Sequence, residues 1–151
     1  MKIVILIVII LAAGLDPAQR NFLSAGVGTR LSSGDGKYVQ VVHTNAGGAG
    51  LNISLGNIDF WANNGQTQNG CDLLDTTCSH VRALAYYTES LNSKVGFIGK
   101  KCDNYNDFTR GGCANNPTAV MGGVTPQTNL TGNFYFTTNS KSPYARGARG
   151  D

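Results

Sequence analysis

The sequence has few charged residues and no concentration of either sign. Only 14% of its 151 residues are charged, and the formal net charge is +3. A protein that binds nucleic acid through the phosphates carries a basic patch or stripe, whereas the Lys and Arg residues here are scattered. We therefore predict no nucleic-acid partner. The 20 glycines indicate a loop-rich chain with a nearly neutral surface, and its length is enough for one domain.

The sequence also lacks an apolar run long enough to cross a bilayer. Its longest run, Ile3 to Ala13, has 11 residues, whereas a membrane-spanning helix needs about 20. We predict no transmembrane segment. Residues 1–14 fit a signal peptide, because Lys2 precedes the run and small residues follow it. They also fit a buried first strand, because Ile and Val dominate. We favour the signal peptide, although its removal would leave Asp16 almost at the new N-terminus.

No C-x-x-C pair is present, so the four cysteines do not have the spacing of a zinc site. Four cysteines allow three pairings, and short loops favour Cys71 with Cys78 and Cys102 with Cys113. Disulfides form in oxidising compartments, so we expect a secreted, extracellular protein. Two glycosylation sequons agree with secretion, and their acceptors are Asn52 and Asn129.

The segment with the clearest chemical potential is Cys78-Ser79-His80-Val81-Arg82. Ser79 suits a helix N-cap, and Val81, Leu84 and Leu91 follow at helical spacing. An imidazole beside a helix N-terminus is biased toward its neutral form, which is the form a general base needs. Asp16 follows the apolar N-terminal run and is the candidate acid.

Three short β-branched or aromatic segments predict strands. They are Tyr38 to Thr44, Gly56 to Trp61, and Phe134 to Thr138. We expect the helix to run to about Asn92, a second disulfide loop to follow it, and residues 147–151 to form a disordered tail.

Five motifs occur in an order that resembles the pancreatic-type lipase and phospholipase A1 family of α/β-hydrolases. They are Leu15-Asp16-Pro17-Ala18, Tyr38 to Asn45, Gly56 to Phe60, Cys78-Ser79-His80, and Pro143-Tyr144-Ala145-Arg146. The resemblance covers residues 15–146 and implies the C-terminal half of the catalytic domain. It implies that Asp16 and His80 are the catalytic acid and base. It also implies a short, insect-like lid made by Asp72, Leu73, Leu74 and Asp75.

The nucleophile of this family is missing from the chain. It lies in a G-x-S-x-G turn before the acid, and the sequence contains no such motif. The nearest segment, around Ser54, lacks the first glycine and lies between Asp16 and His80. The sequence therefore predicts a partial α/β-hydrolase fold in a carboxylic-ester hydrolase family whose substrates are lipids, inactive as this chain. The alternatives are a non-catalytic lipid-binding or yolk-type storage protein of lipase ancestry, and an incomplete enzyme fragment.

Two further residues carry weaker expectations from the resemblance. Relatives that bind calcium use two carboxylates shortly after the acid, but here Ser32 stands at one of the two positions and leaves only Asp35. We expect no other cofactor. His43 lies in a predicted strand at a position where the family has a histidine outside the triad, so we expect a packed structural residue. The expected partner is a lipid ester or a phospholipid surface.

Overall fold

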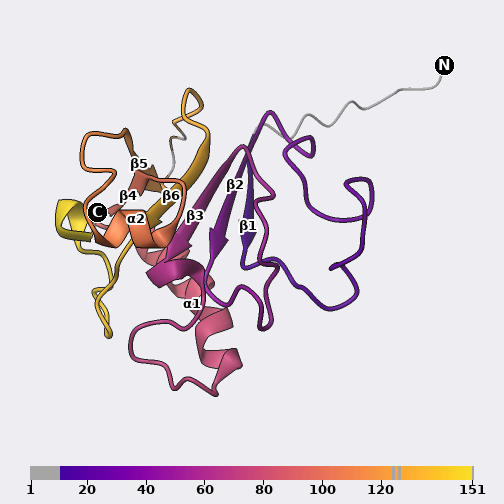
Figure 1. The fold of residues 1–151 in the computed structure, drawn as a ribbon, viewed down its shortest axis with the longest axis horizontal. Helices are drawn as coiled ribbons and strands as arrows, with labels where there is room; N and C mark the ends of the chain where they lie inside the picture. The colour runs from indigo at the N-terminus through magenta and orange to yellow at the C-terminus, as the bar shows by residue number, and fades with distance from the viewer. Residues whose placement is uncertain (1–10, 124, 126, 151) are drawn as a thin grey trace.

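The computed structural model describes residues 11–123, 125 and 127–150, and within them it shows a six-stranded sheet with a few short helices (Figure 1). The strand order is β1-β2-β3-β6-β4-β5. The strands are β1 Leu11–Leu15, β2 Tyr38–His43, β3 Ile58–Ala62, β4 Phe97–Lys101, β5 Thr118–Met121 and β6 Gly132–Phe136. The helices are η1 Asn63–Gly65, α1 Thr76–Ser90, α2 Tyr105–Thr109 and η2 Gly147–Gly150. This is an α/β arrangement, as the sequence predicts.

The half of the sheet that carries the candidate acid is parallel. Strands β1, β2, β3 and β6 run in one direction, whereas β4 is antiparallel to both β5 and β6. Every residue of β2 and β3 is buried, as expected for parallel strands covered on both faces. Parallel pairing brings the carboxyl ends of neighbouring strands to one edge, and Leu15 lies opposite Val42 there.

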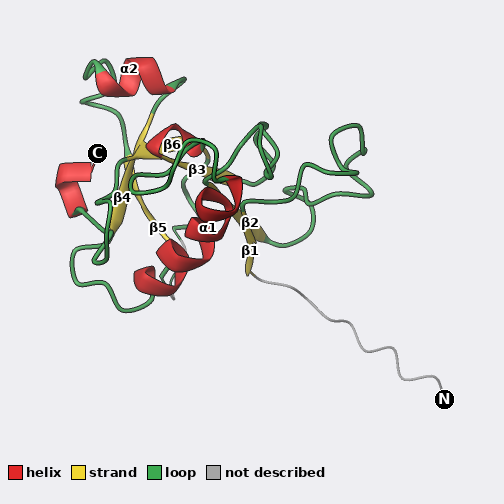
Figure 2. Ribbon diagram, turned by 90° about the horizontal axis from the view of Figure 1, so that it is seen from below, coloured by secondary structure: helices red, strands yellow, loops and turns green. Residues whose placement is uncertain are grey.

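Helix α1 covers one face of the sheet. Its Ala83 and Tyr86 pack with Val42, Phe60 and Phe134, which point to that face. The other face is covered by loops and by the segment containing α2, and Figure 2 shows the two helices on opposite sides of the sheet. Among the described residues, no helix is long and apolar enough to cross a bilayer.

Helix α1 begins earlier than the sequence predicts. Its N-cap is Asp75, whose side chain accepts a hydrogen bond from the Cys78 backbone N at 2.8 Å, so the prediction of a Ser79 cap was wrong. Ser79 is buried inside the helix, where its hydroxyl accepts a hydrogen bond from the Gln68 backbone N. His80 therefore lies one turn into α1, close to the N-terminus of the helix but not beside its cap.

The two cysteine pairings are confirmed. Cys71 is bonded to Cys78 and Cys102 to Cys113, each with a Cα–Cα separation of 5.7 Å. The second disulfide loop contains more regular structure than we expected. The described chain from residue 97 to residue 121 forms β4, α2 and β5. These elements escaped notice because they are short: β4 and α2 have five residues each and β5 has four.

The two ends of the described chain also bear on the predictions. Residues 11–14, which the sequence assigns to a signal peptide or a first strand, lie in β1, and residues 1–10 lie outside the described residues. The predicted disordered tail is instead the turn η2 up to Gly150, and Asp151 lies outside the described residues. Backbone hydrogen bonds hold this turn, because Thr137 N donates to Gly150 O and Gly147 N donates to Gly96 O.

Candidate active site

Asp16 directly follows β1 and is fully buried. Its backbone N donates to Val42 O at 2.7 Å, which continues the pairing of β1 with β2. Its φ of 47° lies in the left-handed region, which an aspartate tolerates better than most residues. One carboxylate oxygen, Oδ1, accepts hydrogen bonds from the backbone N atoms of Thr44 and Asn45, both at 2.9 Å. The carboxylate is therefore held at the carboxyl edge of the sheet by the chain that leaves β2.

The other carboxylate oxygen of Asp16 meets the ring of His80. His80 Nδ1 lies 2.6 Å from Asp16 Oδ2, and the His80 side chain is 37% exposed. Because an ionised carboxylate only accepts hydrogen bonds, the proton of this bond belongs to Nδ1. In the neutral ring Nε2 then carries a free lone pair, and within the described residues it has no hydrogen-bond partner. The structure thus brings together the two residues that the sequence proposes as acid and base.

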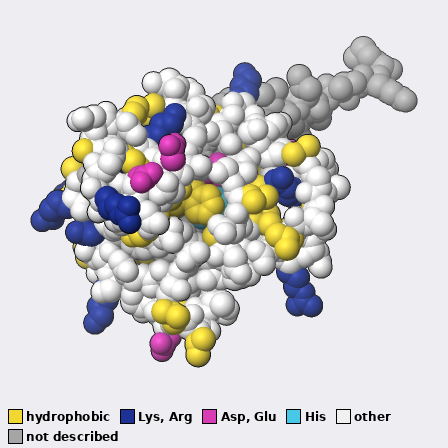
Figure 3. Space-filling model, in the orientation of Figure 1, with side chains coloured by type: hydrophobic (Ala, Val, Ile, Leu, Met, Phe, Trp, Pro, Cys, Tyr) yellow, Lys and Arg dark blue, Asp and Glu magenta, His cyan; other side chains and the backbone are white. Residues whose placement is uncertain are grey.

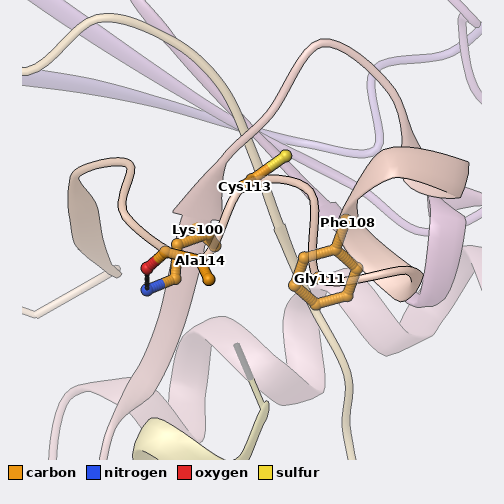
Figure 4. A pocket seen from close by; sticks show the side chains of 5 residues that line it. All are labelled: Lys100, Phe108, Gly111, Cys113 and Ala114. Atoms are coloured by element: carbon orange, nitrogen blue, oxygen red, sulfur yellow. Dashed lines mark hydrogen bonds between the residues drawn. The ribbon is translucent and has the colours of Figure 1, made fainter.

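An open hollow of about 620 Å³ lies beside this pair. His80 lines it together with residues of the loop after Asp16 and of the loop after β2, which are Ala18, Gln19, Arg20, Asn21, Leu23, Gly48 and Ala49. A smaller hollow of about 180 Å³ lies beside the second disulfide (Figure 4). Lys100 lines that hollow and donates to Ala114 O at 3.2 Å, and none of its lining residues belongs to the acid–base pair. The larger hollow is therefore the candidate substrate site.

Gly50 is a site residue that the sequence analysis missed. A Cβ atom at this position would lie 2.4 Å from Asp16 Oδ1 and 2.6 Å from both Asp16 Cγ and Oδ2. The backbone of residue 50 thus approaches the buried carboxylate closely, and no side chain fits between them. The only signal in the sequence is the run of small residues from Ala46 to Gly50.

The second histidine forms a separate, fully buried pair. His43 Nε2 lies 2.8 Å from Asp59 Oδ1, and both side chains are buried. The His43 ring stacks on Trp61, with ring centroids 3.8 Å apart and an angle of 9° between planes. Asp59 also accepts hydrogen bonds from the backbone N atoms of Leu55 and Gly56. His43 is therefore packed and hydrogen-bonded, as the sequence predicts.

The remaining predicted residues lie apart from the acid–base pair. One oxygen of the Asp35 carboxylate, Oδ2, accepts from the backbone N and the hydroxyl of Ser32, at 2.8 and 3.3 Å, so Ser32 donates to this carboxylate and supplies no second one. The described residues contain no group of three or more His, Cys, Asp or Glu side chains suited to a metal. Asp35 and Ser32 together offer one carboxylate, which does not fit the two-carboxylate calcium site expected from the resemblance. We derive no step from calcium. Asn52 and Asn129 are exposed, and their glycosylation stays a prediction.

The predicted lid residues divide between two roles. Asp75 caps α1, whereas Leu73 and Leu74 are 80% and 93% exposed. Figure 3 shows apolar side chains protruding at the lower edge of the molecule, where Figure 1 draws the loop that leads into α1. On the same face Lys and Arg side chains are dispersed and form no single patch.

The buried phenols do not act as acids or bases near neutral pH. Burial raises the pKa of Tyr38 to about 12, and its hydroxyl donates to Leu130 O. Burial also raises the pKa of Tyr86, although its hydrogen bond with Thr138 and the charge of Arg82 act in the opposite direction. Both side chains are protonated under physiological conditions and stabilise the core.

Comparison with known proteins assigns this arrangement to a family. The Lipase family matches residues 9–144, and phospholipase A1 of Vespa crabro is 37% identical over 134 residues, which cover 87% of this chain and 44% of the relative. The chain belongs to the lipase family. Phospholipase A1 member A of Bos taurus is 34% identical over 106 residues, covering 66% of this chain and 23% of the relative.

The chain is also similar to a pancreatic lipase-related protein. Pancreatic lipase-related protein 2 of Cavia porcellus is 35% identical over 106 residues, covering 66% of this chain and 24% of the relative. The chain spans less than half the length of the curated lipase-family relatives that it matches.

The close approach of Gly50 generates a test of the site. The variant Gly50→Ala should displace the Asp16 carboxylate and break its contact with His80, because the new Cβ overlaps all the carboxylate atoms. A crystal structure, or the loss of the nuclear Overhauser contact between the residue 16 and residue 80 side chains, measures this. Gly26→Ala is the matched control, since a Cβ there meets nothing within 4 Å. An unchanged Asp16–His80 contact in Gly50→Ala would contradict the geometry described.

Proposed function

We propose that this chain supplies the acid and the general base of a lipid carboxylic-ester hydrolase. The observation that carries the proposal is the 2.6 Å contact between His80 Nδ1 and the buried, hydrogen-bonded carboxylate of Asp16. In such a site the base removes the proton of a serine hydroxyl as its oxygen attacks the ester carbonyl, and then delivers that proton to the departing alkoxide. Asp16 orients the ring of His80 and stabilises the imidazolium that forms between these two steps.

The nucleophile is the part that this chain does not provide in our proposal. The sequence has no G-x-S-x-G segment. Ser54, the nearest candidate, is exposed, and its hydroxyl donates to the Asn133 side chain at 2.8 Å. Asn133 is a residue of β6 that also accepts from the Trp61 ring N, so Ser54 takes part in a surface contact instead of a bond with His80. The serine and the oxyanion donors then come from polypeptide beyond these 151 residues.

The substrate in this proposal is a phospholipid or another lipid ester, cleaved outside the cell. Several relatives are named phospholipase A1, and the loop between Cys71 and Cys78 is short. Two disulfides suit an oxidising compartment. The alternative of an incomplete enzyme fragment is compatible with the same chemistry, because the pair acts only when a nucleophile is brought to it.

A chimera tests the proposal. On its own, this chain should neither hydrolyse p-nitrophenyl esters or phosphatidylcholine nor react with a serine-directed fluorophosphonate. When it replaces the matched region of Vespa crabro phospholipase A1, we expect phosphatidylcholine hydrolysis. His80→Ala should then lower kcat about 10⁴-fold or more, and Asp16→Asn to a similar extent, because removal of a triad member has effects of this size.

The control in the same chimera is Ser54→Ala, which should leave kcat unchanged. Turnover in the chimera that His80→Ala does not affect would contradict the assignment of the base. Turnover by the lone chain, lost in His80→Ala and accompanied by fluorophosphonate labelling, would show that a serine of this chain is the nucleophile.

A second candidate function is binding to a lipid surface without catalysis. It is favoured by the exposure of Leu73 and Leu74, two adjacent apolar side chains at the tip of a disulfide-closed loop. Full burial of a leucine side chain gives about 1.5–3 kcal/mol, so two of them contribute appreciably to the binding of a peripheral protein. This candidate requires no nucleophile, and it corresponds to the non-catalytic lipid-binding alternative.

Vesicle partitioning measures this second function. The double variant Leu73→Gln/Leu74→Gln should bind phosphatidylcholine vesicles about tenfold or more weakly than the unmodified chain, because the two side chains would no longer enter the apolar phase. Leu84→Gln is the matched control, since Leu84 is also exposed but lies on α1 away from the loop tip. Equal losses in the two variants would contradict a specific role of the loop, and no binding by the unmodified chain would remove the candidate.

A further inference from the structure

Gln68 is buried where the acid-bearing and histidine-bearing parts of the chain meet. It lies between η1 and α1, and the residue is 1% exposed. Its Nε2 donates to Thr44 O at 2.9 Å and to Ala62 O at 2.8 Å, and its Oε1 accepts from the Asn63 side chain at 2.8 Å. The amide thus uses both its donor and its acceptor groups, and it joins the ends of β2 and β3.

One of these hydrogen bonds is made to the same peptide group that binds the Asp16 carboxylate. The carbonyl of Thr44 and the N–H of Asn45 belong to the same peptide group. Gln68 donates to that carbonyl, and the N–H at the other end of the peptide donates to Asp16 Oδ1. A donor at the carbonyl polarises a peptide and strengthens its N–H as a donor, by about 10–30% per bond. A continuous series of hydrogen bonds therefore runs from Gln68 through this peptide to Asp16 and on to His80 Nδ1.

Gln68 also contacts the residue that precedes the histidine. Its backbone N donates to the Ser79 hydroxyl at 3.0 Å, inside the buried side of α1. A second bond between the same two parts of the chain joins the Thr44 hydroxyl to His80 O at 3.4 Å. Gln68 and Thr44 therefore join α1 to the end of β2 by hydrogen bonds, in addition to the contact through Asp16.

We infer that Gln68 is the positioning residue of the acid–base pair, holding the Thr44–Asn45 peptide so that it polarises and orients Asp16 toward His80. Gln68 touches neither ring nitrogen of His80, so it acts through the peptide and the carboxylate. The inference rests on the proposed function for its catalytic meaning, but the hydrogen bonds themselves are testable in the chain without turnover.

The structure supplies an internal control for this inference. Thr44 N and Asn45 N donate to the same oxygen of Asp16 at the same distance, 2.9 Å. The Thr44 N–H belongs to the peptide whose carbonyl is that of His43, and Gln68 makes no hydrogen bond to that carbonyl. Loss of the Gln68 donor should therefore weaken the Asn45 bond and leave the Thr44 bond less affected, whereas a general loss of stability would affect both equally.

The experiment is amide-proton NMR on the 151-residue chain and the variants Gln68→Met and Gln68→Glu. Gln68→Met removes the whole side-chain amide. Gln68→Glu keeps Oε1 as the acceptor for Asn63 and replaces the Nε2 donor with a carboxylate oxygen. In each variant the Asn45 amide proton should move upfield and exchange about threefold to tenfold faster relative to that of Thr44. Gln66→Met is the matched control, because Gln66 is exposed and two residues away.

The opposite results overturn the inference. Equal responses of the Thr44 and Asn45 amide protons would show that Gln68 is merely structural. If neither proton responds, Gln68 does not act on the hydrogen bond from Asn45 N to Asp16. In the unmodified chain, the absence of a through-hydrogen-bond coupling between Gln68 Nε2 and the Thr44 carbonyl carbon would overturn the inference even if both variants failed to fold. A chimera without turnover would contradict the proposed function alone and leave these measurements standing.

Discussion

The buried carboxylate of Asp16 is the constraint on which the rest of the site depends. A charge removed from water costs several kcal/mol unless hydrogen bonds and an opposite charge replace the lost hydration. Here two backbone N–H groups and one imidazole N–H do so. These partners come from the end of β2 and from α1, whereas Asp16 itself follows β1. Satisfying this single charge therefore sets the relative positions of three segments that are distant in sequence.

The two histidines of the chain show how one chemical pair acquires two roles. Each imidazole contacts one aspartate, through Nε2 in His43 and through Nδ1 in His80. His43 is buried in the core, and its other nitrogen, Nδ1, has no hydrogen-bond partner in the part of the chain that the structure describes. His80 is partly exposed and lines a hollow. Access to solvent and substrate, and not the histidine–aspartate contact itself, separates the candidate base from the structural residue.

Part of the site follows from local sequence, and part follows only from the fold. Asp16 and His80 are recognisable because each lies in a short distinctive motif at the end of a strand or near the start of a helix. The disulfide pairing follows from loop lengths. Gly50 and Gln68 escaped notice because their importance depends on contacts across 34 and 24 residues of sequence, to Asp16 and Thr44. Tertiary contacts also explain why the predicted helix cap was wrong. The Ser79 hydroxyl accepts a hydrogen bond from Gln68 N, and Asp75 caps the helix instead.

The central claim is that Asp16 holds His80 with its proton on Nδ1, so that Nε2 is free to act as a base. The ¹⁵N chemical shifts of the imidazole rings distinguish the two neutral tautomers, and they measure this claim directly on the purified chain above the pH at which the rings are charged. The account predicts the Nδ1–H tautomer for His80, reverting to a mixture in Asp16→Asn, and the Nε2–H tautomer for His43 beside Asp59. A neutral His80 that carries its proton on Nε2 would have its lone pair on Nδ1, facing Asp16, and would contradict the account.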